Sequence, residues 1–397
     1  MSDTKLELAG GQDQVGAAKE YYFARLGTLM VTRPKPESAA VVAAAIVQKL
    51  SEDSRIPGTI DVEDIDDFWS SWRGMFPANS SGANTVLTGE DGFASVEFSA
   101  PIVFTLRVAV QHQQSHHGTD QPPTDTYAVA WDGLTLLVVW KQKSRHLPLS
   151  GGHIAAKVIT DAITAAGFGS YTQACSPGCD YVFLHTAMEV SADAASEKAE
   201  IEPAAGASNN RVRFTIGYDA RGELEEMALF GLLSLRTSSG HFAEVKNVGR
   251  RILDIRNQIR ADLSHLLAHN YAYASGRALS PVKRMKAARA NRGWRKEGRQ
   301  LMARLWLAMS NVDSLTERWL DSLRSLQDSR YDIGEMFLFG YDMRSDISEI
   351  EAIDLQRVVD AMNQVASTFD SRVLAVSTSL GALGGAVAGS VITVASQ

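Results

Sequence analysis

"TYAVAWDGLTLLVVWK", residues Thr126–Lys141, is the stretch that decides the fold of the first half of this chain. Two apolar runs flank Asp132-Gly133, and an Asp-Gly pair favours the two-residue type I′ turn of a β-hairpin. Such runs are typical of strands, and a turn this short requires the two strands to be antiparallel. The sequence therefore predicts an antiparallel sheet built around this hairpin.

Further strand-like runs lie on both sides of the hairpin and alternate with helix-like segments. Strands are expected at residues 21–31, 93–100, 102–111, 181–190 and 211–219, and helices at residues 37–50, 61–76, 151–169 and 223–235. We therefore predict an α+β domain over residues 20–237, with a mixed, largely antiparallel sheet and helices around it. This domain is a candidate for sensing or binding a ligand, and residues 1–19 are expected to form a flexible N-terminus.

The composition changes near residues 237–240, and no further strand is expected beyond that point. Apolar residues recur at steps of three and four, which is the spacing of a helix with one buried stripe. Long helices are predicted at residues 242–274, 282–329 and 345 to at least 380. Residues 238–372 are therefore predicted to form an all-α bundle or stalk of long helices.

The last segment, residues 373–397, contains no Asp, Glu, Lys, Arg or His. Small residues stand four apart within it, at Ser377, Gly381, Gly385 and Gly389, a spacing that lets two helices approach closely in lipid. Glycine costs a water-exposed helix about 1 kcal/mol relative to alanine, so the segment favours a self-associating C-terminal transmembrane helix. A soluble packed or oligomer-interface helix and a disordered tail are the alternatives.

A basic stretch, Val282–Arg304, carries nine Lys or Arg and one Glu in a chain whose net charge is −7. It is interpreted either as a solvated helix face, paired with the acidic residues 197–202, or as a site that binds an anionic surface. Anionic lipid headgroups suit such a site, because each basic residue near a membrane contributes about 1 kcal/mol; nucleic acid and another anionic ligand are the alternatives. The residues concerned are Lys283, Arg284, Lys286, Arg289, Arg292, Arg295, Lys296 and Arg299.

The chain contains two cysteines, Cys175 and Cys179, which excludes a disulfide framework and indicates a reducing, cytoplasmic compartment. Together with His185 they form a candidate metal site for zinc. Their spacing is not the usual CxxC, and a second pair is absent. No cofactor is indicated, because the sequence lacks the common phosphate-binding and catalytic motifs.

These features predict a membrane-associated, self-associating interaction or effector protein. Its cytoplasmic head would be attached to the inner face of the cell membrane by the C-terminal helix. The expected partners are a second copy of the chain, anionic lipid and an unknown small-molecule ligand of the head. The alternative is a soluble cytoplasmic enzyme with its active site in the α+β domain, because loops and hairpin tips often carry function. Its candidate residues are Asp132, Cys175, Cys179, Asp180 and His185.

Overall fold

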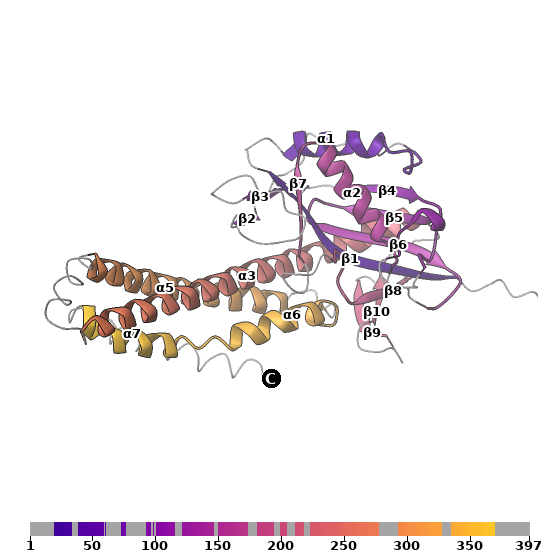
Figure 1. Ribbon diagram of the computed structural model, residues 1–397. Coiled ribbons are helices and arrows are strands. Elements are labelled where there is room, and N and C mark those ends of the chain that lie inside the picture. The colour runs from indigo at the N-terminus through magenta and orange to yellow at the C-terminus, as the bar shows by residue number, and fades with distance from the viewer. Residues whose placement is uncertain are drawn as a thin grey trace, which may run out of the picture.

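The computed structural model describes residues 20–33, 39–58, 60, 73–76, 93–96, 98, 101–115, 121–146, 150–173, 181–193, 199–204, 211–217, 223–277, 293–327 and 335–369. They form an α+β head and a helical arm that projects from it (Figure 1). The term head refers to strands β1–β10 with their connecting segments and helices α1 and α2. The term arm refers to helices α5, α6 and α7 and to the part of α3 that they contact. The predicted mixed α+β fold with a mainly antiparallel sheet is confirmed.

The predicted hairpin consists of β5 (Thr126–Trp131) and β6 (Thr135–Gln142), which pair antiparallel. The Asp132 N–H donates to the Thr135 carbonyl, so the two residues between them are the centre of the turn. The first of these, Gly133, has a φ of 87°, a left-handed conformation that glycine adopts without strain. Both strands are almost wholly buried, which explains why their sequences are continuous apolar runs rather than alternating patterns.

The hairpin belongs to a ten-stranded sheet whose main path has the order β4-β5-β6-β1-β8-β10-β9. Strand β1 (Tyr21–Arg33) pairs with β6 and β8 through its first half and with β7 and β3 through its second half. Among the described strands only β8 and β10 pair in parallel. The other strands are β2 (Arg73–Phe76), β3 (Phe93–Val96), β4 (Ile102–Arg107), β7 (Gly169–Thr172), β8 (Ala187–Ala192), β9 (Glu200–Pro203) and β10 (Arg211–Ile216). Residues 73–76 are thus a strand, not the end of the predicted helix.

Helices cover both faces of the sheet, and side-chain size differs between the faces. Large β5 residues such as Val129 and Trp131 point to the core under α1 (Ala39–Ser51) and α2 (His153–Ala165). The alternate β5 residues are small alanines that point to the opposite core, because successive side chains of a strand face opposite sides. The first half of α3 (Leu224–Arg277) packs on this face, against β4, β5, β6 and β10. The alanine surface therefore lets a long helix lie close to the sheet.

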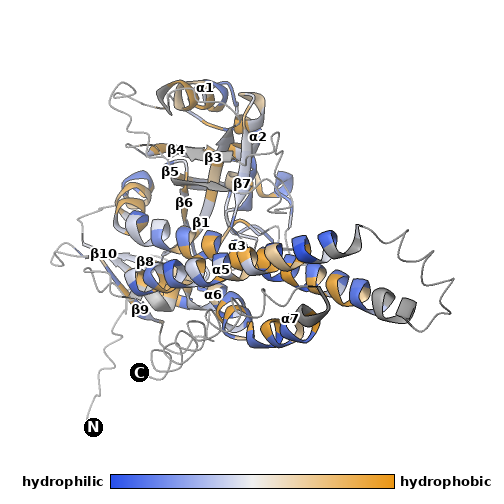
Figure 2. Ribbon diagram, turned by 90° about the vertical axis from the view of Figure 1, so that its left-hand side faces the viewer, coloured by the Kyte–Doolittle hydropathy of each residue, from blue (hydrophilic) through white to orange (hydrophobic). Residues whose placement is uncertain are grey.

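The arm begins where α3 leaves the sheet. This helix has 54 residues and is therefore about 80 Å long. Helix α5 (Trp294–Gln327) runs back along it in the antiparallel direction, and Arg304 lies 3.5 Å from Asp262 across the pair. Hydrophilic and hydrophobic residues alternate along the arm helices in Figure 2, as expected for helices with one buried stripe.

Two shorter helices lie along this pair, where one long helix was predicted for residues 345–380. The predicted start and the predicted continuity are wrong, because α6 covers Glu335–Glu351 and α7 covers Gln356–Phe369, while the predicted end lies outside the described residues. The Oδ1 atom of Asp354 accepts the N–H of Gln356 at 3.1 Å, which is the bond of an N-cap residue and starts a new helix. The predicted domain boundary at residue 237 lies inside α3, which continues through it.

The predicted transmembrane helix is corrected by this structure. Among the residues that are described, no helix combines the length and the apolarity that a bilayer crossing requires, and residues 370–397 lie outside the described part. The sequence gives the physical reason, because only nine of the 23 residues 373–395 are Val, Leu or Ile. Gly, Ala, Ser and Thr supply little transfer free energy to a span. The membrane and transmembrane assignments therefore lack support.

Candidate functional site at the junction of head and arm

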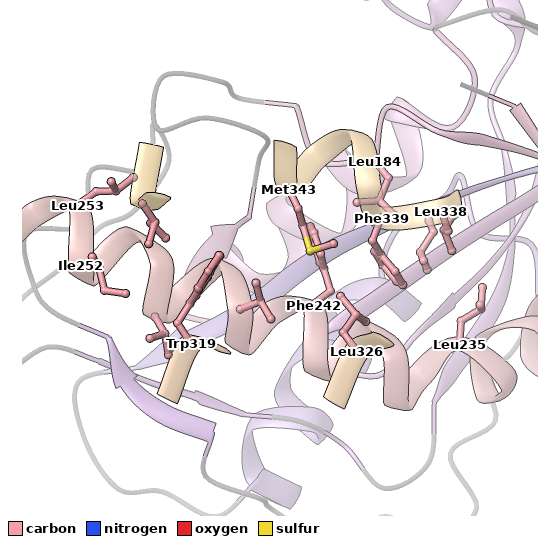
Figure 3. Close-up of a cluster of buried hydrophobic side chains, with 14 of the residues drawn as sticks. Leu184, Leu235, Phe242, Ile252, Leu253, Trp319, Leu326, Leu338, Phe339 and Met343 are labelled. Carbon is pink, nitrogen blue, oxygen red and sulfur yellow. The ribbon is translucent and has the colours of Figure 1, made fainter. Parts of the chain in front are cut away.

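Helix α6 joins the arm to the head, and apolar side chains form most of the contact. The Phe242 ring of α3 stacks on the Phe339 ring of α6, with centroids 4.8 Å apart and an angle of 22° between the planes. Figure 3 shows Phe339 and Met343 of α6 beside Phe242, with Leu184 of the head nearby. All four side chains are buried. This packing positions a set of charged groups that lie in the same interface.

A buried ion pair connects α3 to α6 inside this apolar surface. The Lys246 Nζ atom lies 2.7 Å from Asp346 Oδ2, and the exposed fractions of the two side chains are 0% and 5%. Burial lowers the pKa of Lys246 and raises the pKa of Asp346, because both charged forms lose solvation, while the attraction between them opposes both shifts. A buried pair costs a large desolvation free energy, which offsets much of the attraction between the two charges.

A second carboxylate of α6, Asp342, holds a histidine of the head. Its Oδ2 accepts the backbone N–H of His185 at 3.0 Å, and its Oδ1 lies 2.6 Å from His185 Nδ1. The Asp342 side chain is 2% exposed and the His185 side chain 30% exposed. The Lys246 ammonium also donates to the Asp342 carbonyl at 3.1 Å. One lysine of α3 therefore contacts both acidic positions of α6, and one of these positions reaches the head.

Aromatic rings surround the histidine. The His185 ring lies 5.3 Å from the Tyr181 ring and 5.1 Å from the Tyr341 ring, measured between centroids. Tyr181 belongs to the head and accepts a hydrogen bond from Arg25 at 2.9 Å. The imidazole thus stands between one tyrosine of the head and one of α6, which fixes the plane of its ring.

Strand β7 is joined to α3 next to the ion pair. The guanidinium of Arg250 donates to the Tyr171 hydroxyl, and the Gln173 side-chain amide donates to the Ala243 carbonyl at 2.8 Å. Burial raises the pKa of Tyr171, and the nearby Arg250 charge opposes that shift. These bonds hold α3 against the head close to the hairpin turn, because Tyr171 and Ala243 share a buried cluster with Leu134.

Asp132, a candidate catalytic residue, has a structural position at the hairpin turn. Its Oδ1 accepts the N–H groups of Leu134 and Thr135 at 3.0 and 2.6 Å. Its Oδ2 lies 3.0 Å from Arg236 Nε of α3, and the aspartate side chain is fully buried. Asp132 therefore fixes both the turn and the position of α3 under the sheet.

A cleft of about 970 Å³ opens on the head beside the first residue of α3, Leu224. The ends of β5 and β6 and the loop that follows β6 line it, with basic groups from Lys141 and His146 and a carboxylate from Glu20. Glu20 lies 3.1 Å from Lys141 Nζ and raises the pKa of Lys141. Charges of both signs suit a polar ligand or a peptide that carries charges of both signs.

The predicted site residues are only partly within the described chain. Cys175, Cys179 and Asp180 lie outside it, and so do Ser377, Gly381, Gly385 and Gly389. Of the basic stretch, the side chains of Lys296 and Arg299 are described and are exposed, whereas Lys283, Arg284, Lys286, Arg289 and Arg292 and the side chain of Arg295 are not described. The described residues contain no group of three metal-binding side chains, so the zinc hypothesis for His185 stays untested.

The junction residues Lys246, Asp342 and Asp346 were not expected from the sequence. A signal was present, because Lys246 lies between the buried Val245 and Val248 on the apolar side of its helix. Asp342 and Asp346 stand four residues apart beside the buried Met343. Charges at positions of an apolar stripe indicate a partner in the core. No protein family, curated protein or solved structure matches this chain.

Proposed function

We propose that this chain is an interaction protein in which α3 couples a ligand-binding or partner-binding head to an arm that self-associates. One observation carries the proposal: a single helix begins at the cleft of the head, passes under the sheet and forms the core of the arm. An occupant of the cleft would contact Leu224, the first residue of that helix. A helix this long moves largely as one body, so a change at its first turn reaches the arm.

The junction supports the coupling. Lys246 of α3 contacts Asp346 and the backbone of Asp342, and Asp342 holds His185 of the head. A buried charged contact has two discrete arrangements, paired or broken, and the packed interface around it is also bistable rather than continuously deformable. The junction therefore suits a switch between two positions of α6 better than it suits a permanent joint.

The outer surface of α5 supports self-association. Leu307 is 65% exposed, which is unusual for a leucine in a helix whose opposite side is well packed. Of the exposed residues three and four positions away, Ala303, Ser310 and Asn311 carry no charge, and the charged one, Arg304, lies 3.5 Å from Asp262 of α3. A mostly uncharged strip around an exposed leucine suits contact with the same strip of a second copy, because a two-fold interface pairs identical surfaces.

Light scattering coupled to gel filtration tests the self-association. We expect the purified chain to elute as a dimer or larger species at tens of micromolar, and Leu307→Glu to shift it to a monomer. Ser325→Glu is the matched control, because it adds the same charge to an exposed position of the same helix. A monomer for the unaltered chain at every concentration, or equal behaviour of the two variants, would refute the proposal.

A second candidate function, an enzyme, is favoured by the His185–Asp342 pair. A carboxylate that holds imidazole Nδ1 fixes the tautomer and orients the ring, as in general-base catalysis. The test is turnover of a panel of activated esters and phosphate esters. His185→Gln and Asp342→Asn should both abolish any activity that depends on this pair, and activity that survives both would exclude the pair as its origin.

A further inference from the structure

One face of α3 is covered along the inner arm and exposed at the outer end. Phe242, Gly249 and Arg256 stand seven residues apart, or about two turns, and therefore share this face. Phe242 stacks on Phe339, and Arg256 lies 3.0 Å from Glu349. A Cβ atom added to Gly249 would lie 3.3 Å from Ile350 Cδ1. Helix α6, with Trp319 of α5 beside Gly249, therefore covers this face of α3.

The same face continues to Leu267 and Tyr271 near the far end of α3. Leu267 stands eleven residues after Arg256, or about three turns, and Tyr271 one further turn along. Leu267 is 43% exposed and Tyr271 is 77% exposed. Two large apolar side chains at this level of α3 are thus in line with a covered helix face, but one is partly exposed and the other mostly exposed.

The end of α7 lies close to this level. From Gly249 to Leu267, α3 rises about 27 Å. Beyond Ile350, a connecting turn and the 14 residues of α7, which rise about 20 Å, follow the outer part of α3 (Figure 1). Phe369, the last described residue, therefore stands near Leu267, and 28 further residues follow it in the sequence.

The sequence after Phe369 continues the pattern by which α7 packs. Among the described side chains of α7, those of Val358, Val359, Met362 and Val365 are buried. Apolar residues recur beyond them at the same steps of three and four, at Phe369, Val373 and Val376. If the chain keeps its direction, these side chains face α3 at the level of Leu267 and Tyr271.

We propose that residues 370–380 of the same chain pack on this face of α3 and cover Leu267 and Tyr271. The partner is the chain's own C-terminal segment, not a second copy, because its start is held beside the surface at a high effective concentration. This assigns the uncharged C-terminal segment a binding surface on the arm. The inference is independent of whether copies of the chain associate.

Disulfide trapping tests the contact. In a background with Cys175→Ser and Cys179→Ser, we introduce Tyr271→Cys together with Val373→Cys and oxidise mildly. The matched control is His265→Cys with Val373→Cys, because His265 is exposed at a similar level on a different side of α3. We expect an intrachain disulfide in the first variant and none in the control, read by non-reducing electrophoresis and peptide mass spectrometry.

Each other result would overturn the proposal. A disulfide between two chains would identify the segment of a second copy as the occupant, and equal trapping in both variants would show no preferred face. A chain truncated after Phe369 gives an independent measurement by hydrogen exchange. Amide protection at residues 264–271 should fall at least about tenfold, with the head unchanged; unchanged protection of those residues would refute the contact.

Discussion

Removing one member of the buried pair Lys246–Asp346 should destabilise the protein strongly. Lys246→Met leaves Asp346, whose side chain is 5% exposed, as a buried carboxylate without its ion-pair partner. Breaking such a pair costs about 3–5 kcal/mol of unfolding free energy. Asp346→Leu should cost a similar amount, because it leaves the buried Lys246 ammonium without its ion-pair partner. If the two effects were independent, the double variant would lose about 6–10 kcal/mol.

The double variant Lys246→Met/Asp346→Leu should instead lose no more than about 3 kcal/mol. Both charges are then absent, and replacing a buried pair by apolar residues is often neutral or stabilising. The remaining cost of about 1–3 kcal/mol comes from the Asp342 carbonyl, which loses the hydrogen bond donated by Lys246. The double-mutant cycle therefore predicts a coupling free energy of at least about 3 kcal/mol.

Urea denaturation followed by tryptophan fluorescence measures these values. The chain has seven tryptophans, and Trp319 is buried close to the junction. Lys296→Met is the control, because it removes an exposed lysine and should change stability by less than about 0.5 kcal/mol. A cost below about 1 kcal/mol for Lys246→Met, or additive effects in the cycle, would refute the buried pair.

Three further variants test other parts of the fold. Asp132→Ala should cost about 3 kcal/mol or more, because it removes two turn hydrogen bonds and the ion-pair partner of the partly buried Arg236; an equal melting temperature to the unaltered chain would contradict this. Gly27→Ala should destabilise by about 1–3 kcal/mol, since the new Cβ would lie 2.6 Å from the Val182 carbonyl oxygen; calorimetry measures it, and a stabilised variant would be inconsistent with that contact. Burial, with the Glu317 charge, raises the pKa of Asp313, so its ionised form destabilises the folded chain. Asp313→Asn should stabilise at pH 7 and have no such effect below the unfolded pKa, where the carboxyl is protonated in both states; a stabilisation that persists at pH 3 would refute it.

The hairpin and the mixed fold were predictable because local signals agree with the tertiary structure. In β5 and β6, turn residues and apolar runs both point to buried antiparallel strands. The length of α3 was not predictable in this way. Ser238, Ser239 and Gly240 are weak helix formers and resemble a break in the sequence. They are buried under the sheet, where small side chains let the helix lie close, so packing outweighs propensity.

The junction was harder to predict than the fold because its residues are far apart in the sequence. His185 and Asp342 are separated by 157 positions, and no local pattern connects them. Lys246, Asp342 and Asp346 each resemble ordinary charges of amphipathic helices. Only the packing of α6 on α3 turns them into one cluster. The sequence marks such residues solely by their place on apolar stripes.

The continuity of α3 has a mechanical consequence. From the edge of the sheet near residue 240 to Arg277, the helix extends about 55 Å. If the helix pivots where it leaves the sheet, a tilt of about 5° displaces its far end by roughly 5 Å. Side-chain rearrangements of less than 1 Å at the pivot produce such a tilt. A small adjustment at the sheet is thus amplified along α3, and the far end of the helix moves by a distance comparable to the length of a side chain.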